Sequence, residues 1–227
     1  MDLKSTKGLH SSKVKAMVYA ESGMGKTTLL GTLPESETLI VSAESGLLCL
    51  DDKDIAVVEI NCWNDLQVVY SHIKKDPEWA HFKYIGIDSL TELSDMLVYT
   101  LENSPEFRDP KMALKMWGEF SKRMTATIKA FRDLDKSVIF TALPEDILDN
   151  GAVVKKPYIK GKAVQKMLAS YFDEVFYLSV NTATDEREVQ TQPSTAVQAK
   201  DRSGKLADFE EANLTTIINK IRGNKNV

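Results

Sequence analysis

The sequence predicts one α/β domain with a mostly parallel, twisted sheet flanked by helices. Short apolar runs alternate with stretches of helical periodicity along most of the 227 residues, which is the pattern of repeated βα units. The apolar runs are nearly continuous, as expected for strands that are buried on both faces. A hydrophobic content of 43% in a chain of this length suits a single domain with a sizeable core.

The chain divides into alternating strand and helix segments. Apolar runs predict strands at residues 14–20, 38–43, 55–60, 84–88, 137–143 and 173–180. Helical periodicity predicts helices at 27–33, 63–75, 90–101, 113–134 and 214–221. We place a single core at 13–223, between a flexible segment at 1–12 and a tail at 224–227.

Two segments depart from the βα pattern. Residues 103–112 hold two prolines and mixed charge, which predicts a surface loop. Residues 144–162 contain Asn150-Gly151 between alternating apolar and polar residues, which is the sequence signature of a β-hairpin. We therefore expect two excursions from one edge of the sheet.

Composition narrows the class of protein. The formal net charge is −4, so a contact with nucleic acid requires a local basic patch. Cys49 and Cys62 are too few for a disulfide framework and lack neighbours that could complete a zinc site. The start of the chain is polar, and no run approaches the ~18 apolar residues of a membrane helix. We expect a soluble, cytoplasmic protein without membrane contact.

The stretch YAESGMGKTTLL at residues 19–30 has the features of a phosphate-binding loop between a strand and a helix. Ala20 stands where the pattern G-x-x-x-x-G-K-[ST] has its first glycine, and a methyl group is tolerated there if φ is not positive. We expect Lys26 to span the β- and γ-phosphates of ATP and the Thr27 hydroxyl to bind Mg²⁺. The residues expected to contact the nucleotide are Glu21, Ser22, Gly23, Met24, Gly25, Lys26, Thr27 and Thr28.

Two acidic residues lie at the end of an expected strand or directly after one. Asp88 ends the strand at 84–88, where a carboxylate can hold Mg²⁺, and it is also suited to cap the next helix. Ser89 comes next, so the Asp-Glu pair that places a base beside the metal in many ATPases is missing. Glu44 follows the strand at 38–43 and can activate the attacking water, because parallel strands end at one crevice. The alternative for Glu44 is an exposed position in a loop.

The segments AESGMGKT, VSAES and IGIDS together resemble the ATPase core of the RecA-like superfamily, which carries its base on the strand of Glu44. The segment QAKDRSGKL at 198–206 resembles the Lys-x-Arg segment of hexameric helicases and circadian-clock-type RecA-like ATPases. In those families the two cations reach the γ-phosphate of a neighbouring subunit, which implies catalytic roles for Lys200 and Arg202. By itself, the triplet is also typical of a solvated charge cluster.

The order of segments over 13–221 is most similar to phage nucleotide-binding proteins that keep only the RecA-like core, such as Sak-type single-strand annealing recombinases. Leu143 departs from the RecA pattern, which has a polar sensor glutamine near that point. The resemblance implies a ring or filament with ATP and Mg²⁺ at subunit interfaces, and single-stranded DNA bound during recombination or annealing in a host cytoplasm. A single-strand DNA-binding protein is a candidate partner. The fingerprint residues of the resemblance are Pro157, Gly161, Lys162, Phe172, Asp173 and Val175.

A lysine-rich stretch between residues 150 and 172 contains no acidic residue. It can follow a phosphate backbone, with an interleaved tyrosine stacked on a base. It can equally be a hairpin edge on which lysines prevent strand pairing. Lys162 can instead face a neighbouring ATP. The stretch contains Lys155, Lys156, Tyr158, Lys160, Lys162 and Lys166.

Two functions of other classes compete with a recombination ATPase. A P-loop kinase for a small acceptor needs an arginine-rich lid, which the sequence does not show clearly. An ATP-gated assembly or packaging factor would bind the nucleotide without DNA-dependent turnover. A GTPase is disfavoured, because no N-K-x-D segment follows Asp88.

Overall fold

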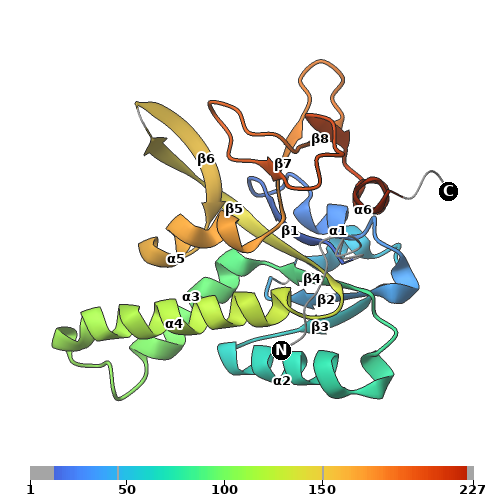
Figure 1. Cartoon of the computed structure of the whole chain (residues 1–227). Coiled ribbons are helices and arrows are strands. Elements are labelled where there is room, and N and C mark those ends of the chain that lie inside the picture. Colours follow the sequence, from blue (N-terminus) through green and yellow to red (C-terminus); the bar gives the residue numbers. More distant parts are fainter. Residues whose placement is uncertain (1–12, 45, 150, 224–227) are drawn as a thin grey trace, which may run out of the picture.

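One ten-stranded sheet organises the part of the chain that the computed structural model describes, residues 13–44, 46–149 and 151–223. The strand order is β10-β8-β7-β1-β5-β4-β2-β3, with β6 paired to β5 and β9 to β7 (Figure 1). The segments expected to be flexible or a tail, 1–12 and 224–227, lie outside the described residues.

Most of the sheet is parallel, including its margin at β3, whereas the margin beyond β7 and the pairing of β6 with β5 are antiparallel. The parallel strands are β1 (Lys15–Tyr19), β2 (Thr38–Ser42), β3 (Ala56–Glu59), β4 (Tyr84–Asp88), β5 (Ser137–Asp149) and β7 (Glu174–Val180). The antiparallel strands are β6 (Ala152–Tyr158), β8 (Arg187–Gln190), β9 (Lys200–Asp201) and β10 (Phe209–Glu211). The mixed α/β class with a mostly parallel sheet is therefore confirmed.

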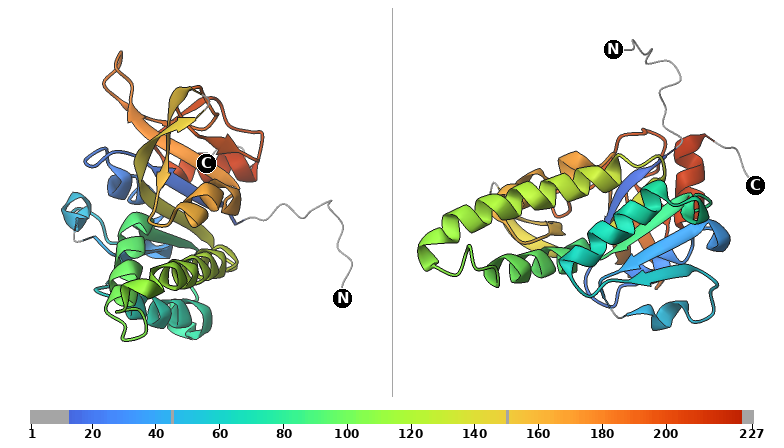
Figure 2. Two further views of the ribbon diagram at one scale, coloured as in Figure 1. Left: turned by 90° about the vertical axis from the view of Figure 1, so that its left-hand side faces the viewer. Right: turned by 90° about the horizontal axis from the view of Figure 1, so that it is seen from below.

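Helices cover both faces of the sheet because successive strand side chains point to opposite sides. Met17 of β1 packs in the core cluster that includes α2 (Trp63–Lys75), α3 (Leu90–Glu102), α4 (Ala113–Arg132) and α5 (Lys162–Met167). Val18 packs on the other face with α1 (Lys26–Leu30) and α6 (Leu214–Arg222). The result is three layers (Figures 1 and 2).

Several expected elements have different bounds in the structure. The helix after the phosphate loop ends at Leu30, with Gly31 as its C-cap, and does not continue to residue 33. Residues 103–112 are not a purely exposed loop, because Phe107 is buried in the core and Pro110–Met112 forms a 3-10 turn. The antiparallel margin was not predicted.

The expected hairpin is present, and it is longer than predicted. β5 does not end at residue 143 but continues to Asp149, and β6 pairs with it from Ala152 to Tyr158. Gly151 has a φ of 84°, which a residue with a side chain rarely adopts. The hairpin projects beyond the central sheet (Figure 1).

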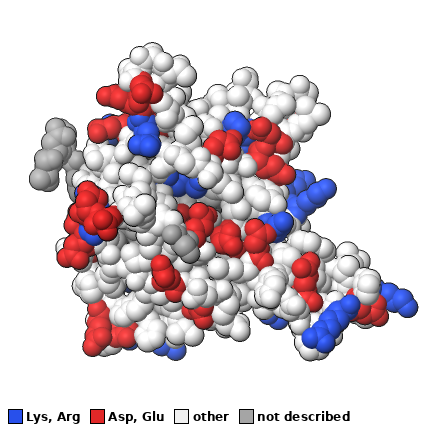
Figure 3. Space-filling view, turned by 180° about the vertical axis from the view of Figure 1, so that it is seen from behind, with Lys and Arg blue, Asp and Glu red and all other residues white. Residues whose placement is uncertain are grey.

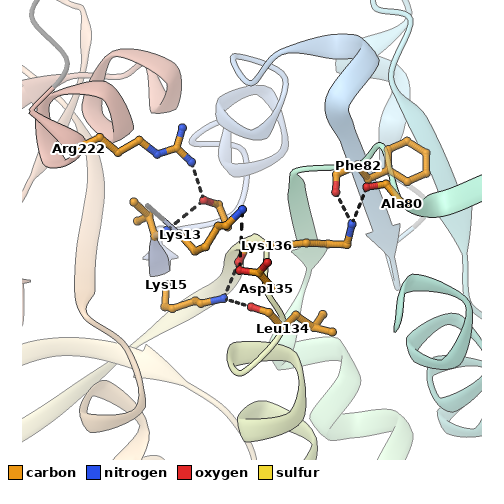
Figure 4. Close-up of polar contacts among 10 residues, drawn as sticks. Lys13, Lys15, Ala80, Phe82, Leu134, Asp135, Lys136 and Arg222 are labelled. Carbon is orange, nitrogen blue, oxygen red and sulfur yellow. Dashed lines mark hydrogen bonds and ion pairs between the residues drawn. The ribbon is translucent and has the colours of Figure 1, made fainter. Parts of the chain in front are cut away.

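Lysine side chains fix the amino-terminal edge of the sheet by binding main-chain carbonyls (Figure 4). Lys15 Nζ donates to the carbonyls of Leu134 and Lys136, and burial lowers the pKa of this amine to about 8. Lys136 Nζ in turn donates to the carbonyl of Phe82. These contacts join the starts of β1, β4 and β5, whose far ends carry the candidate site.

No helix within the described ranges is long and apolar enough to cross a bilayer.

Candidate functional site

The candidate site lies at the carboxyl edge of the parallel strands. Tyr19 of β1 is in register with Ala142 of β5, and Ser42 of β2 is in register with Asp88 of β4. Since β5 lies between β1 and β4, the loop after β1 and the carboxylate of Asp88 are brought to one crevice. This is the edge at which open α/β sheets bind ligands.

The loop between β1 and α1 has the backbone that its glycines allow. Gly23 and Gly25 have φ values of 79° and 94°, in the region that favours glycine. Ala20 is fully buried, and its N–H donates to Ala142 O over 3.2 Å, so it extends the pairing with β5. Asp185 is the one non-glycine residue with positive φ in the described chain. Ala20 therefore occupies the place of the usual glycine without backbone strain.

Lys26 is buried beneath this loop. Its Nζ donates to the carbonyls of Ala20 at 3.0 Å and Glu21 at 3.2 Å. Burial lowers the pKa of Lys26, and the carboxylates of Glu44, Asp88 and Glu21 act in the opposite direction. The ammonium is thus held among three acidic groups. Glu21, Ser22, Gly23 and Thr28 are exposed, and Met24 and Gly25 are partly buried.

Asp88 is held by hydroxyl groups from two other elements. Thr27 Oγ1 donates to Asp88 Oδ2 over 2.6 Å, and Thr141 Oγ1 of β5 donates to Asp88 Oδ1. Asp88 is not the cap of α3, because the Ser89 side chain accepts from Glu92 N and fills that role. The Asp88 carboxylate therefore does not cap a helix and remains at the crevice.

The Thr27 and Asp88 pair fits Mg²⁺. No group of three or more metal-ligating side chains occurs among the described residues. Mg²⁺ usually binds one or two protein carboxylates together with phosphates and water, so a hydroxyl and a carboxylate held 2.6 Å apart are suitable oxygen ligands.

Glu44 lies beside Asp88 and is partly buried. Ser89 Oγ donates to Glu44 Oε1, and Ser42 Oγ donates to the Glu44 carbonyl. Among the described residues no partner holds Oε2. One oxygen of the carboxylate is therefore oriented by Ser89, while the other can accept a proton.

Three residues of this site were not identified from the sequence. Thr141 is a hydroxyl residue within an otherwise apolar buried strand, and that position was its only signal. Ser89 was noted only as a departure from the Asp-Glu pattern. Arg187 of β8 contacts the loop through Met24 O, and nothing in the sequence connects these two segments.

Lys200 and Arg202 lie at the opposite edge. Lys200 of β9 is in register with Val175, and Glu174 at the start of β7 is in register with Ala16 of β1. Lys200 Nζ donates to the carbonyls of Ala169 and Phe172, and Arg202 forms an ion pair of 2.6 Å with Asp173. Within one protomer these cations are therefore not part of the phosphate loop site.

The lysine-rich stretch meets acidic residues from other parts of the chain. Lys155 Nζ lies 3.0 Å from both Glu21 and Asp146. Lys156 pairs with Asp149 at 2.7 Å, and Lys160 pairs with Asp95 at 3.3 Å. On the face shown in Figure 3, basic side chains are likewise scattered among acidic ones. Much of the positive charge is thus locally compensated.

Tyr158 and Lys162 of the same stretch have different surroundings. The main-chain carbonyl of Tyr158 accepts from Thr91 Oγ1 over 2.8 Å, which holds the end of the hairpin against α3. Lys162 is the first residue of α5, directly after Gly161. The backbone of Tyr158 is thus held against α3, whereas Lys162 lies at the start of α5.

A family model described as an AAA domain matches residues 12–203. The chain belongs to this family. The matched range of the AAA domain contains the phosphate loop, Glu44, Asp88 and the segment with Lys200 and Arg202. A search of curated proteins gave no match.

Two solved structures are similar to this AAA domain. A KaiC-like protein from Pyrococcus horikoshii has 14% sequence identity and a TM-score of 0.42, and the alignment covers 78% of this chain and 76% of that chain. The RadB recombinase has 14% identity and a TM-score of 0.46, with coverage of 78% and 79%.

Proposed function

We propose that this AAA domain is a RecA-like, Mg²⁺-dependent ATPase that assembles as a ring or filament with ATP at subunit boundaries. Its proposed task is single-stranded DNA recombination or annealing of the phage Sak type. The observation that carries the proposal is the grouping of Thr27, Asp88 and Glu44 around the phosphate loop. Phosphoanhydride hydrolysis needs a phosphate-binding loop, ligands for Mg²⁺ and a carboxylate that is positioned to activate water.

Each residue has a distinct role in the proposed reaction. The loop N–H groups and Lys26 bind the phosphates, and Thr27 with Asp88 hold Mg²⁺, which when bound neutralises phosphate charge. Glu44, oriented by Ser89, accepts a proton from the attacking water through Oε2. Thr141 keeps the Asp88 carboxylate in place.

The positions of Lys200 and Arg202 support a site that two protomers share. Both residues lie at the amino edge of the sheet, whereas the phosphate loop lies at the carboxyl edge. A head-to-tail assembly brings opposite edges of neighbouring copies together. Arg202 of one protomer then stabilises charge at the γ-phosphate bound by the next, once it leaves Asp173.

Mixing two inactive variants tests the shared site. Glu44→Gln lacks the base and Arg202→Ala lacks the arginine, so each should hydrolyse ATP slowly by itself. In a random equal mixture roughly a quarter of the interfaces combine both intact halves, so hydrolysis should recover to that level. The control is Arg123→Ala, an arginine paired with Glu119 on α4. The proposal fails if the mixture stays inactive, or if wild-type turnover is independent of protein concentration and of Arg202.

An ATP-gated assembly or packaging factor is the second candidate. The ion pairs of Lys155, Lys156 and Lys160 favour it, because they leave the hairpin with little free positive charge for DNA. ATP turnover with and without single-stranded DNA separates the two: stimulation supports recombination, and its absence supports the assembly factor. A small phosphate acceptor that stimulates turnover would instead indicate a kinase.

A further inference from the structure

Two basic side chains from outside the phosphate loop contact it at separate points. Lys155, on β6 of the hairpin, forms an ion pair with the Glu21 carboxylate at 3.0 Å. Arg187, on β8 of the antiparallel margin, donates from Nε to the Met24 carbonyl over 2.9 Å. Glu21 and Met24 flank the apex of the loop, so the two contacts hold both of its sides.

The main chain of Lys155 is held by hydrogen bonds on both its N–H and its carbonyl. Its N–H donates to Ala196 O over 2.8 Å, and its carbonyl accepts from Gln198 N at 3.0 Å. The hydroxyl of Tyr19, the last residue of β1 before the loop, lies 3.0 Å from the same Lys155 carbonyl. Hydrogen bonds to Glu21 and Asp146 raise the pKa of Lys155, so the side chain remains charged.

Arg187 fits closely against the other side of the loop. A Cβ atom added at Gly25 would lie 2.9 Å from Arg187 Nε, so the arginine occupies the space that a side chain there would need. A guanidinium carries further N–H donors beyond Nε. No other partner for them is present among the described residues, so only the Met24 contact fixes the group.

We propose that Lys155 and Arg187 are positioning residues that hold the phosphate loop in its nucleotide-binding shape. The loop's own support comes mainly from the Lys26 bonds to the Ala20 and Glu21 carbonyls and a turn bond from Met24 N to Glu21 O. The helix that follows adds little, since α1 has only five residues and its N-cap, Gly25, provides no side-chain cap. A loop that binds phosphates through backbone N–H groups gains affinity when its shape is fixed before binding. This inference rests on the proposed nucleotide-binding function.

The ion pair between Lys155 and Glu21 connects the hairpin directly to the proposed nucleotide site. Lys155 lies between Asp146 on β5 and Glu21 in the loop, with 3.0 Å to each. Residues 196–198, which hold the Lys155 backbone, lead directly to Lys200. A ligand that draws Lys155 away from Glu21 would free the Glu21 side of the phosphate loop. Binding at the hairpin would then reach the nucleotide site through Lys155, whereas RecA has a polar sensor residue near the position of Leu143.

The test measures equilibrium binding of a fluorescent ATP analogue to the full chain. Lys155→Met and Arg187→Met should each weaken binding about threefold to tenfold, which is the range of an exposed ion pair or a single hydrogen bond. The matched controls are Lys115→Met and Arg123→Met, which remove exposed ion pairs with Glu106 and Glu119 elsewhere. Both controls should bind as the wild type does.

Further measurements distinguish positioning from a general loss of stability. Lys155→Arg keeps the charge and should restore affinity, and Lys155→Met should have no further effect in a Glu21→Gln background. In steady-state assays KM should rise while kcat stays unchanged, because the contact acts on binding. If the wild type binds the analogue and both Met variants match it, or if the controls weaken binding equally, the inference is wrong. If the wild type does not bind at all, the proposed function itself fails.

Discussion

Thr27 Oγ1 donates a 2.6 Å hydrogen bond to Asp88 Oδ2, although Thr27 comes after β1 and Asp88 ends β4, and these two strands are not neighbours in the sheet. The strand between them, β5, supplies Thr141, which donates to the other oxygen of the same carboxylate. Asp88 is only 2% exposed, and burial of this kind strengthens the hydrogen bonds that its carboxylate accepts. The carboxylate is therefore fixed in position by the fold.

Replacing Thr27 tests its proposed role as a magnesium ligand. Thr27→Ala removes the hydroxyl, so the tightening of nucleotide binding by Mg²⁺ should fall by about tenfold or more. Thr27→Ser keeps the hydroxyl and should retain the effect. The measurement is a Mg²⁺ titration of fluorescent ATP binding. Equal Mg²⁺ dependence in Thr27→Ala and the wild type would exclude the role.

Thr141→Val separates shape from hydrogen bonding at Asp88. Valine has nearly the same shape as threonine, but it leaves Asp88 Oδ1 without its donor. We expect the protein to be destabilised by about 1–3 kcal/mol and the affinity for Mg²⁺ to fall by about tenfold. Urea unfolding and Mg²⁺ titration measure the two effects. Unchanged values in both would show that Thr141 does not hold the carboxylate.

The sequence was sufficient for the features that depend on local patterns. Continuous apolar runs indicated the parallel strands, which are buried except for the edge strand β3, where Val57 is exposed. Glu44, after β2, and Asp88, at the end of β4, lie at the expected edge because parallel strands share a direction. Asn150-Gly151 indicated the hairpin for the same local reason.

Features that depend on distant partners were not predictable. β8 and β10 are short, partly polar strands: β8 pairs with the edge that β7 offers, and β10 pairs in turn with β8. Lys155 and Glu21 are 134 positions apart, so the sequence showed a lysine-rich stretch without the acid that pairs with it. Pairing of this kind follows from topology, which a linear pattern does not contain.

A pair of glycine substitutions tests the packing of the start of α5 against α4. Gly161 has a φ of 85°, and a Cβ there would lie 2.5 Å from the Phe120 ring. Gly161→Ala should therefore lower the free energy of unfolding by about 1–3 kcal/mol. Gly118→Ala is the matched control, since nothing lies within 4 Å of its added Cβ on the exposed side of α4. It should stabilise the protein by about 0.5–1 kcal/mol, and equal effects at both sites would contradict the packing.

A buried carboxyl next to the proposed trans-acting residues gives the stability a pH dependence. Glu174 is 2% exposed, and its Oε2 has no hydrogen-bond partner among the described residues. Burial, followed by the neighbouring charge of Asp201, raises the pKa of Glu174 from 4.5 to about 8. Asp201 also accepts from the N–H groups of Ser203 and Gly204, so this carboxyl pair lies at the base of the segment that carries Lys200 and Arg202.

The sign of the effect follows from proton binding. Below pH 4.5 Glu174 is protonated in both the folded and the unfolded chain, and the full stability is present. Between pH 4.5 and about 8 the unfolded chain has lost this proton and the folded chain retains it. The contribution of Glu174 to the free energy of unfolding should thus decrease as the pH rises, by up to about 1.4 kcal/mol per pH unit.

Glu174→Gln keeps the side chain neutral at every pH and should remove this slope. Relative to the wild type, the variant should gain roughly 1 kcal/mol or more in stability between about pH 5 and about pH 8. Urea unfolding at a series of pH values measures the difference. The control is Glu106→Gln, the same chemical change at an exposed carboxylate on the surface. Stability curves that run parallel for Glu174→Gln and the wild type would show that Glu174 is already ionised in the folded protein, because only a retained proton produces the slope.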